Sequence, residues 1–329
     1  MTRALMAAGR VRCITSPNPW VGAVVRSTEG ELFEGATREP GREHAEVIAL
    51  QAAGGAARGS TLYVTLEPCD HTGRTGPCTT AILDAGVARV VIGVEDPDPS
   101  VGGRGIRALR DAGVDVTVGV QAEQVASQLA AYLTHRRTGR PWVVLKLASS
   151  LDGGTAAPNG SSQWITSPPA RVDGHRLRAE SDAILVGAGT VRRDDPSLTV
   201  RDYKPPVLPT GGTLDPMRVV LGAVPDDAKV RPCRQMSGDL GAMLDELGAD
   251  GVVQLLVEGG ASVAGDFHRA GLVDRYVIYV APALFGGDDA NGLFEGAGAW
   301  DISEIWRGRF VGVERVGEDL RVELAPQEA

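Results

Sequence analysis

Short runs of β-branched residues alternate with helical stretches along the whole chain, and this alternation restricts the fold more than any other feature. In the first half, strand-like runs lie at Val21–Val25, Thr61–Leu66 and Arg89–Val94, with a helical stretch at Ala45–Ala53 between the first two. Glycine occurs 43 times, close to double its usual share of roughly 7%, and the glycines fall at the junctions. Strands that alternate with helices predict a mainly parallel or mixed sheet covered on both faces. We therefore expect a three-layer α/β/α fold for the first half of the chain.

Chain length and a punctuated junction predict two domains. The 329 residues are about twice the length of one ordinary domain. A helical stretch from Ala122 to Arg137 ends at Thr138-Gly139-Arg140-Pro141, before a new strand at Trp142–Leu147. We place the boundary there, which gives domains 1–140 and 141–329. The second domain repeats the alternation, with strands expected at Asp182–Val186, Arg218–Leu221, Val252–Val257 and Tyr276–Val280, helices at Asp239–Leu247 and Ala261–Ala270, and a final hairpin through Gly317-Glu318-Asp319.

The composition is that of a soluble globular protein. Hydrophobic residues make up 43% and charged residues 23% of the chain, which excludes wholesale disorder and a fibrous repeat. No segment approaches the roughly 18 uninterrupted apolar residues of a membrane span. Four cysteines are too few for a disulfide scaffold in a chain of this length. We therefore expect a cytoplasmic protein with reduced thiols and no membrane partner.

The net charge of −9 is unevenly distributed. Residues 1–140 carry 15 arginines against 15 acidic residues, whereas the remainder carries 18 basic and 27 acidic residues. Neither half has the basic excess of a protein that binds a nucleic-acid backbone. A small-molecule substrate is the better expectation, and a nucleic-acid editing enzyme is disfavoured.

One group of residues in the first domain has the chemistry of a zinc hydrolytic site. His44 opens a helix, Cys69 follows a strand, and Cys78 opens the next helix. One imidazole and two thiolates can bind Zn²⁺ and leave its fourth position for a water molecule, whose pKa falls to about 7. Glu46, two residues after the histidine, would then move protons between that water and a departing amine. The alternative is a closed structural zinc site with His71 as fourth ligand, which would leave Glu46 without a role.

Four segments of the first domain carry more specific motifs than the zinc ligands alone, namely Ser16–Gly22, His44–Glu46, Tyr63–Cys78 and Glu95–Pro99. Zinc deaminases of nucleobases share a His-x-Glu and a Pro-Cys pattern, but their two cysteines are commonly three positions apart. Here they are nine apart. Together these motifs resemble the RibD family of bifunctional riboflavin-biosynthesis deaminase/reductases, in which the longer cysteine spacing is characteristic.

The resemblance implies specific roles in the first domain. It implies a cytidine-deaminase-like α/β/α domain. It also implies one Zn²⁺ held by His44, Cys69 and Cys78, with proton transfer by Glu46. It also implies a homodimer and a set of contacts to a pyrimidine ribosyl phosphate, namely Asn18, Arg74, Asp96 and Asp98. Two positions depart from the family pattern, because Thr37 stands where many members have histidine and Asp98 where asparagine is common.

Five segments of the second domain together resemble the reductase half of the same family, namely Ala148–Gly153, Gly160–Thr166, Ala183–Thr190, Arg193–Arg201 and Leu256–Gly260. A strand joins a helix through Leu256-Val-Glu-Gly-Gly260, where glycines let backbone amides approach a phosphate. This is not the Gly-x-Gly-x-x-Gly fingerprint, so an ordinary turn explains it equally well. The resemblance implies a dihydrofolate-reductase-like α/β domain. It also implies NADPH at Ala148, Trp164, Thr190, Asp194, Gly260, Ala261, Ser262, Val263, Ala264, Gly265 and Asp266, and the phosphorylated substrate at Ser162, Arg178, Leu198, Arg201 and Glu258.

The second domain is short in one region. Only about thirty residues separate the strand that ends near Gly222 from the strand at Val252, and no strand is evident between them. The sequence therefore leaves two functions open. One is a bifunctional enzyme that deaminates a diaminopyrimidine ribosylamino phosphate and then reduces the ribosyl side chain of the product with NADPH. The other is a deaminase whose second half is a weak reductase or a binding or dimerisation module.

Overall fold

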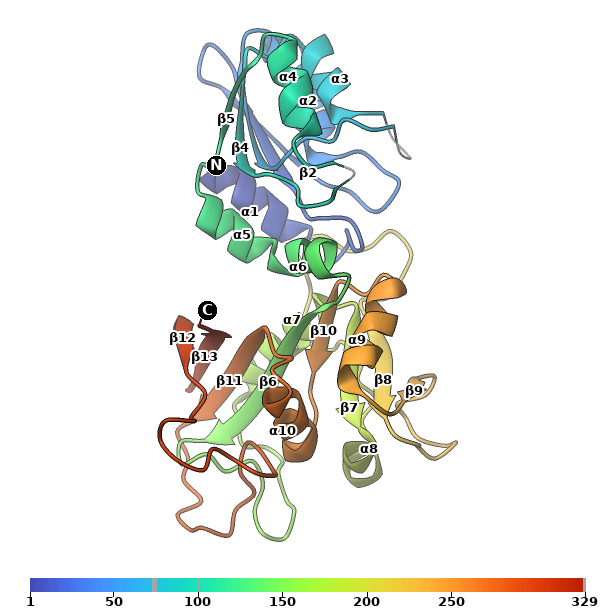
Figure 1. Cartoon of the computed structure of the whole chain (residues 1–329), viewed down its shortest axis with the longest axis vertical. Coiled ribbons are helices and arrows are strands. Elements are labelled where there is room, and N and C mark those ends of the chain that lie inside the picture. Colours follow the sequence, from blue (N-terminus) through green and yellow to red (C-terminus); the bar gives the residue numbers. More distant parts are fainter. Residues whose placement is uncertain (73–75, 100, 328–329) are drawn as a thin grey trace. The chain divides into compact units, whose positions relative to one another are not determined.

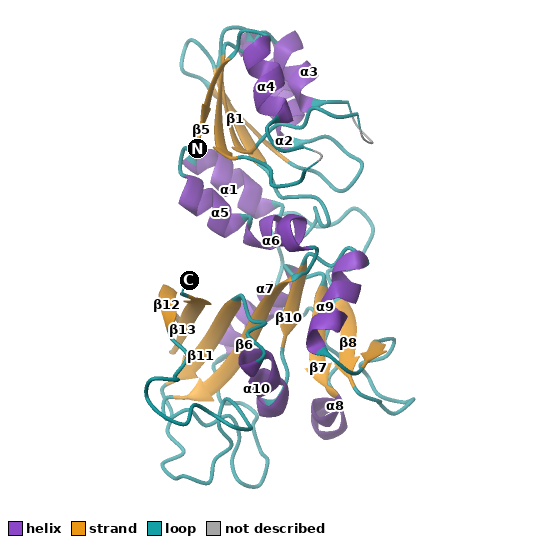
Figure 2. Ribbon diagram, viewed as in Figure 1, coloured by secondary structure: helices purple, strands orange, loops and turns teal. Residues whose placement is uncertain are grey.

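The computed structural model describes residues 1–72, 76–99 and 101–327, and the chain forms two compact units (Figures 1 and 2). The first unit comprises residues 1–139 and the loop 205–212, and the second comprises residues 140–204 and 213–329. Each unit has its own sheet. None of the described helices is long and apolar enough to span a lipid bilayer.

A mixed five-stranded sheet forms the centre of the first unit, in the order β2-β1-β3-β4-β5. Strand β1 pairs antiparallel with β2 and β3, whereas β3, β4 and β5 run parallel. The carboxyl ends of the parallel strands therefore lie at one edge, the usual place for a site in such a sheet. The strands are β1 (Gly22–Arg26), β2 (Leu32–Ala36), β3 (Thr61–Leu66), β4 (Arg89–Val94) and β5 (Asp115–Val118).

Helices cover both faces of this sheet, and two glycines allow them to approach closely. A Cβ atom on Gly22 would lie 1.9 Å from the carbonyl oxygen of Ala4, and one on Gly35 would lie 2.2 Å from that of Ala45. Gly35 lies opposite Ala23, the residue after Gly22. Successive residues of a strand point to opposite faces, so the two glycines lie on opposite faces of the sheet. Helices α1 (Thr2–Arg10) and α5 (Ala122–Gln128) cover one face, and α2 (Ala45–Ala53), α3 (Cys78–Asp84) and α4 (Arg104–Asp111) cover the other (Figure 1).

The helix expected over residues 122–137 is two helices, so that prediction was wrong in one respect. Helix α5 ends at Gln128, and α6 (Ala130–Thr138) begins after Leu129, which is fully buried. The Trp20 indole donates a 3.0 Å hydrogen bond to the Gln128 carbonyl oxygen, which satisfies that acceptor at the break. A short 3₁₀ turn at Gly54–Ala57 follows α2.

An eight-stranded sheet forms the centre of the second unit, in the order β12-β13-β11-β6-β10-β7-β8-β9. Strands β11, β6, β10, β7, β8 and β9 run parallel, and the β12–β13 hairpin adds two antiparallel strands at one edge. The strands are β6 (Trp142–Ser150), β7 (Ala183–Gly187), β8 (Met217–Leu221), β9 (Arg234–Met236), β10 (Gln254–Val257), β11 (Arg275–Ala281), β12 (Gly308–Val316) and β13 (Asp319–Pro326).

Two hydrophobic cores fill the space between this sheet and its helices. On one face, Leu145 and Leu255 pack with Leu247 of α9 (Leu240–Ala249) and with Phe267 of α10 (Ala261–Arg269). On the other face, Ile184 and Leu256 pack with Leu177 of α7 (Pro168–Ala179). Helix α8 (Ala188–Asp194) follows β7 at the carboxyl end of the sheet.

The short region after Gly222 does contain a strand, contrary to the sequence prediction. Strand β9 has only three residues and pairs with β8 at the edge of the sheet. Met236 is its one buried residue. A strand so short shows no alternation of apolar and polar residues, so the sequence pattern could not reveal it.

Candidate active sites

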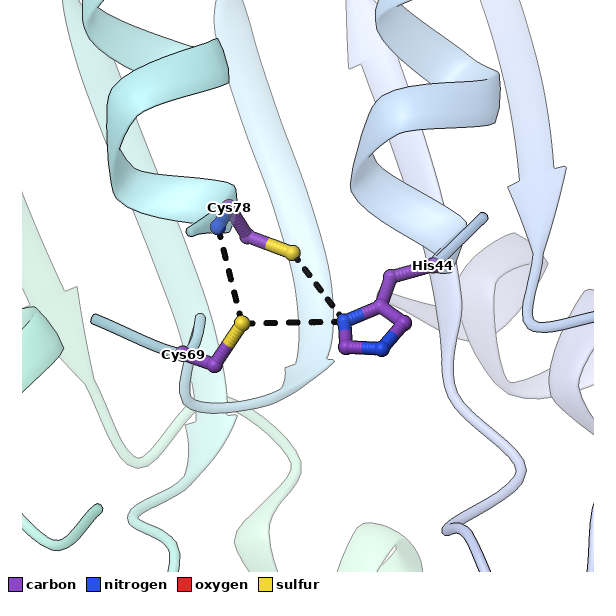
Figure 3. A group of neighbouring side chains, drawn as sticks. All are labelled: His44, Cys69 and Cys78. Carbon is purple, nitrogen blue, oxygen red and sulfur yellow. Dashed lines mark hydrogen bonds between the residues drawn. The ribbon is translucent and has the colours of Figure 1, made fainter. Parts of the chain in front are cut away.

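Three side chains from separate elements of the first unit converge into a metal-binding group (Figure 3). His44 is the residue before α2, Cys69 lies in the loop after β3, and Cys78 is the first residue of α3. The Nδ1 atom of His44 lies 3.2 Å from Sγ of Cys78 and 3.6 Å from Sγ of Cys69. The donor atoms of all three residues lie within 4.8 Å of one another.

The donor set fits Zn²⁺. Nitrogen and sulfur donors are the ligands that zinc prefers, and three protein ligands leave one position for a water molecule. The hydrogen bond with Cys78 lowers the pKa of Cys69, whereas the same contact and burial raise the pKa of Cys78. A bound metal cation lowers the pKa of a neighbouring thiol and so favours the deprotonated form of both cysteines. His71 does not join this group among the described residues, although it lines the cavity described below.

Glu46 lies on the first turn of α2 beside the metal-binding group. Its side chain is 4% exposed, and burial together with the nearby Cys69 charge raises the pKa of Glu46 to about 7. A cavity of about 450 Å³ opens over Glu46 and His44. The arrangement places a carboxyl group where it can exchange a proton with a molecule in the cavity.

The residues expected to contact a pyrimidine substrate lie around the same cavity. Asn18, Asp96 and Asp98 all line it, although they come from different segments of the chain. Asn18 precedes β1, and the two aspartates follow β4. Arg74 lies outside the described residues.

Helix α6 contributes two cavity residues that the sequence did not indicate. The Tyr132 hydroxyl donates a 3.0 Å hydrogen bond to Oδ2 of Asp96, and the Asp98 amide donates one of 2.9 Å to Oδ1. Arg136 lies against the Tyr132 ring at 5.1 Å. Burial raises the pKa of Asp96. No local motif marks Tyr132, because it meets Asp96 only through the fold.

The carboxyl ends of the parallel strands in the second unit bring several expected cofactor residues together. Gly260 follows β10, and a Cβ atom there would lie 3.5 Å from Oγ1 of Thr190 on α8. A Cβ on Gly259 would lie 2.5 Å from Val263, so this turn is packed tightly against α10. Ala148 lies near the end of the neighbouring strand β6. This edge is where open α/β sheets bind ligands.

Other expected cofactor residues have different surroundings. Ala264 is fully buried in the core, and Gly265 packs against the Glu295 carbonyl. Trp164 is 66% exposed, with the Arg171 guanidinium 4.7 Å from its ring. The remaining members of the expected set lie on α8 or on the first turns of α10, namely Asp194, Ala261, Ser262 and Asp266.

Two residues expected to bind the reductase substrate bind each other. Nε and Nη2 of Arg178 each donate a 2.8 Å hydrogen bond to a carboxylate oxygen of Glu258, and Nη1 donates to the Thr199 carbonyl at 3.0 Å. Burial alone would raise the pKa of Glu258, but Arg178, with help from Lys146 and His175, lowers it to about 2. Neither Lys146 nor His175 belongs to the set of substrate residues that the sequence predicts.

The remaining expected substrate residues lie on nearby loops. Leu198 is buried with a φ of 52°. Arg201 is exposed, its guanidinium donates to Ser197, and its backbone amide donates a 3.2 Å hydrogen bond to Nδ1 of His175. Ser162 is half-buried in the loop before α7.

Comparison with known proteins assigns each unit to a class. The family described as "Cytidine and deoxycytidylate deaminase zinc-binding region" matches residues 1–94. The family described as "RibD C-terminal domain" matches residues 141–322. The chain is therefore a zinc-binding deaminase domain followed by a reductase domain.

Full-length relatives identify the family. The riboflavin biosynthesis protein RibD of Escherichia coli is 39% identical over 98% of each chain, and that of Mycobacterium tuberculosis is 43% identical over 98% of this chain and 96% of the relative. The solved structure of Acinetobacter baumannii RibD (form 1) superimposes with a TM-score of 0.91 at 36% identity, covering 99% of this chain and 98% of the other. The chain belongs to the RibD family of riboflavin biosynthesis proteins.

Membership of this family confirms the expected fold class and the bifunctional enzyme. Zn²⁺ belongs to the deaminase domain, in which His44, Cys69 and Cys78 could form the metal site, and NADPH belongs to the reductase domain. Both domains match along the chain, so a deaminase without a reductase is not favoured.

Proposed function

We propose that the chain deaminates diaminohydroxyphosphoribosylaminopyrimidine and then reduces 5-amino-6-(5-phosphoribosylamino)uracil, in domains 1–140 and 141–329 respectively. A Thermotoga maritima protein described as a diaminohydroxyphosphoribosylaminopyrimidine deaminase/5-amino-6-(5-phosphoribosylamino)uracil reductase superimposes on 99% of this chain, with a TM-score of 0.86 at 34% identity. The observation that carries the proposal is the convergence of His44, Cys69 and Cys78 beside the buried Glu46, at a cavity large enough for a pyrimidine nucleotide.

In the deaminase domain, His44, Cys69 and Cys78 would hold Zn²⁺. When bound, zinc supplies Lewis-acid activation of water. The Glu46 carboxylate takes a proton from the attacking water and delivers it to the departing amine. Its burial keeps this proton away from bulk solvent, and its place on the first turn of α2 fixes its distance from the metal ligand His44.

The pyrimidine and its phosphate would be held by Asn18, Arg74, Asp96 and Asp98. Asp96 suits recognition of a ring amine or amide, because two hydrogen bonds hold its carboxylate in one orientation. A fixed acceptor binds a ring donor more tightly than a mobile one does, because less ordering entropy is lost on binding.

In the reductase domain, NADPH would lie at the carboxyl ends of β6, β10 and β7. Glycines at 259 and 260 let backbone amides approach a phosphate, and the first turn of α10 supplies further donors. Arg178 and Glu258 would bind the ribosyl phosphate substrate together with Ser162, Leu198 and Arg201. These residues orient the sugar while the cofactor supplies the hydride.

We also propose a homodimer in the cytoplasm that acts on small molecules and not on nucleic acid. The edge strand β12 carries the exposed side chains of Phe310 and Val313, at 72% and 59% exposure. Trp300 and Ile302, in the preceding loop, are 91% and 74% exposed. Apolar groups of this size on the edge strand of a sheet support association with a second copy.

An assay of the purified protein on the pyrimidine substrate tests this proposal. With zinc and no NADPH, ammonia should appear and the deaminated product should accumulate. With NADPH, the same protein should consume the cofactor and form the ribityl product. Ammonia release without saturable NADPH oxidation would contradict the second half of the proposal.

A further inference from the structure

The carboxylate of Glu67 is buried at the end of β3, and its bonding is unusual. It is 4% exposed and accepts three backbone hydrogen bonds. Oε2 accepts from the amides of Asp96 at 3.2 Å and Gly103 at 2.9 Å, and Oε1 accepts from the amide of Ile106 at 3.1 Å. One side chain thus ties together the end of β3, the residue after Glu95 and the start of α4.

The Glu67 carboxylate caps the N-terminus of α4, whose own N-cap residue cannot do so. Helix α4 begins at Arg104, and its N-cap residue, Gly103, has no side chain to cap it. The first amides of a helix have no partner within the helix and carry partial positive charge. Glu67 accepts from two of them, and such charge-assisted bonds are stronger than neutral ones.

The start of α4 is also packed against the chain that carries the metal ligand Cys69. A Cβ atom on Gly105 would lie 1.9 Å from the carbonyl oxygen of Pro68. Only glycine permits this approach. Glu67 and Pro68 therefore fix α4 and the Cys69 segment against each other.

We propose that Glu67 is a positioning residue of the deaminase site, acting through Asp96. Glu67 fixes the backbone of Asp96, while Tyr132 and the Asp98 amide fix its carboxylate. Together these contacts hold Asp96 at the cavity wall in one orientation. The inference rests on the proposed role of Asp96 in substrate binding. If Glu67 were only a structural anchor, its substitution would lower the stability of the protein and leave the deaminase KM unchanged.

The variant Glu67→Gln tests this role. An amide cannot accept at both ends, so at least one backbone amide loses its acceptor and faces a donor. Deaminase KM should rise roughly 10- to 100-fold, in line with the loss of charge-assisted bonds, while kcat falls by less than about 3-fold and bound zinc stays at one per chain. Hydrogen exchange at the amides of Asp96 and Ile106 should accelerate at least about 10-fold. Glu95→Gln is the matched control. Glu95 is exposed and directly precedes Asp96 in the chain, and its substitution removes the same charge.

A double variant separates positioning from stability. If Glu67 acts through Asp96, Glu67→Gln should raise KM much less in an Asp96→Asn background than in the wild type. If Glu67→Gln does not fold, Glu67→Asp keeps the charge with a shorter reach and should give a smaller rise in KM. The KM and kcat of the reductase should not change in any of these variants.

Two results would overturn the inference in distinguishable ways. Faster exchange with an unaltered deaminase KM, in a protein whose wild type is active, would reduce Glu67 to a structural anchor. A wild type that bound zinc and released no ammonia would overturn the proposed function, and the role of Glu67 with it.

Discussion

Arg178 and Glu258 form a two-point ion pair, in which Nε and Nη2 of the guanidinium each lie 2.8 Å from a carboxylate oxygen. Both side chains are mostly buried, at 15% and 11% exposure. The pair joins α7 to the residue that follows β10, so it links the two elements that flank the proposed reductase site. A phosphate that binds Arg178 would have to share or replace this partner.

The variant Glu258→Gln should weaken both folding and reduction. Removing one partner of a buried pair leaves the other charge uncompensated, which costs about 3 kcal/mol of unfolding free energy at pH 7. Reductase KM should rise at least about 10-fold, and ammonia release should not change. Denaturant unfolding and the two separate assays measure these effects.

The control for this prediction is Asp245→Asn. Asp245 also makes a two-point pair, with Arg140 at 2.6 and 2.9 Å, but it is exposed. Surface pairs contribute little, so this variant should leave the unfolding transition nearly unchanged. Equal losses in the two variants would mean that burial does not set the strength of these pairs.

Asp274 should make stability depend on pH. Burial raises its pKa to about 6, against the 2.7 Å hydrogen bond from the Val143 amide and the charge of Arg275. The folded state then binds this proton more tightly than the unfolded state, so stability should rise as pH falls from about 7 towards 4. A shift of about two pKa units limits the effect to about 3 kcal/mol.

The variant Asp274→Asn should lack this part of the pH dependence, because an amide keeps an acceptor for Val143 and cannot ionise. Urea unfolding at pH 5 and pH 7.5 measures the difference between the variants. If the wild type and Asp274→Asn showed the same change in unfolding free energy between these pH values, the raised pKa would be contradicted.

Gly22→Ala should destabilise the first unit by more than about 2 kcal/mol, because its Cβ would lie 1.9 Å from the Ala4 carbonyl and force α1 away from the sheet. Gly55→Ala is the matched control, since a Cβ there meets nothing within 4 Å. Thermal unfolding of the two variants should differ by several degrees. Similar melting temperatures would show that α1 shifts without cost.

The sequence predicted the locally encoded parts of the fold well. The helix Ala45–Ala53 and the strands Thr61–Leu66 and Arg89–Val94 have the expected bounds, because each is a mainly apolar run with a glycine or a polar residue directly after it. Strand β2 and helix α7 were not predicted. Strand β2 has mixed polar and apolar residues, with one buried residue among its five. Helix α7 carries charged side chains that become largely buried only through tertiary contacts, so the sequence did not mark them as part of a buried helix.

The candidate sites show the same difference between residues that belong to local motifs and residues that meet only through the fold. His44, Glu46, Cys69 and Cys78 belong to short motifs whose chemistry can be read from residue type and spacing, and the structure brings them together. Tyr132 and Glu67 were missed, because their hydrogen-bond partners lie 29 to 39 residues away in the chain and share no motif with them. Tertiary packing alone gives these two residues their roles.

Glu46 provides the most direct test of the central claim, that one chain carries two independent catalytic sites. In Glu46→Gln loaded with zinc, ammonia release from the pyrimidine substrate should fall at least about 100-fold. NADPH oxidation with the deaminated intermediate should continue at the wild-type rate. Loss of both activities in a folded, zinc-loaded Glu46→Gln protein would contradict the claim, as would ammonia release at the wild-type rate.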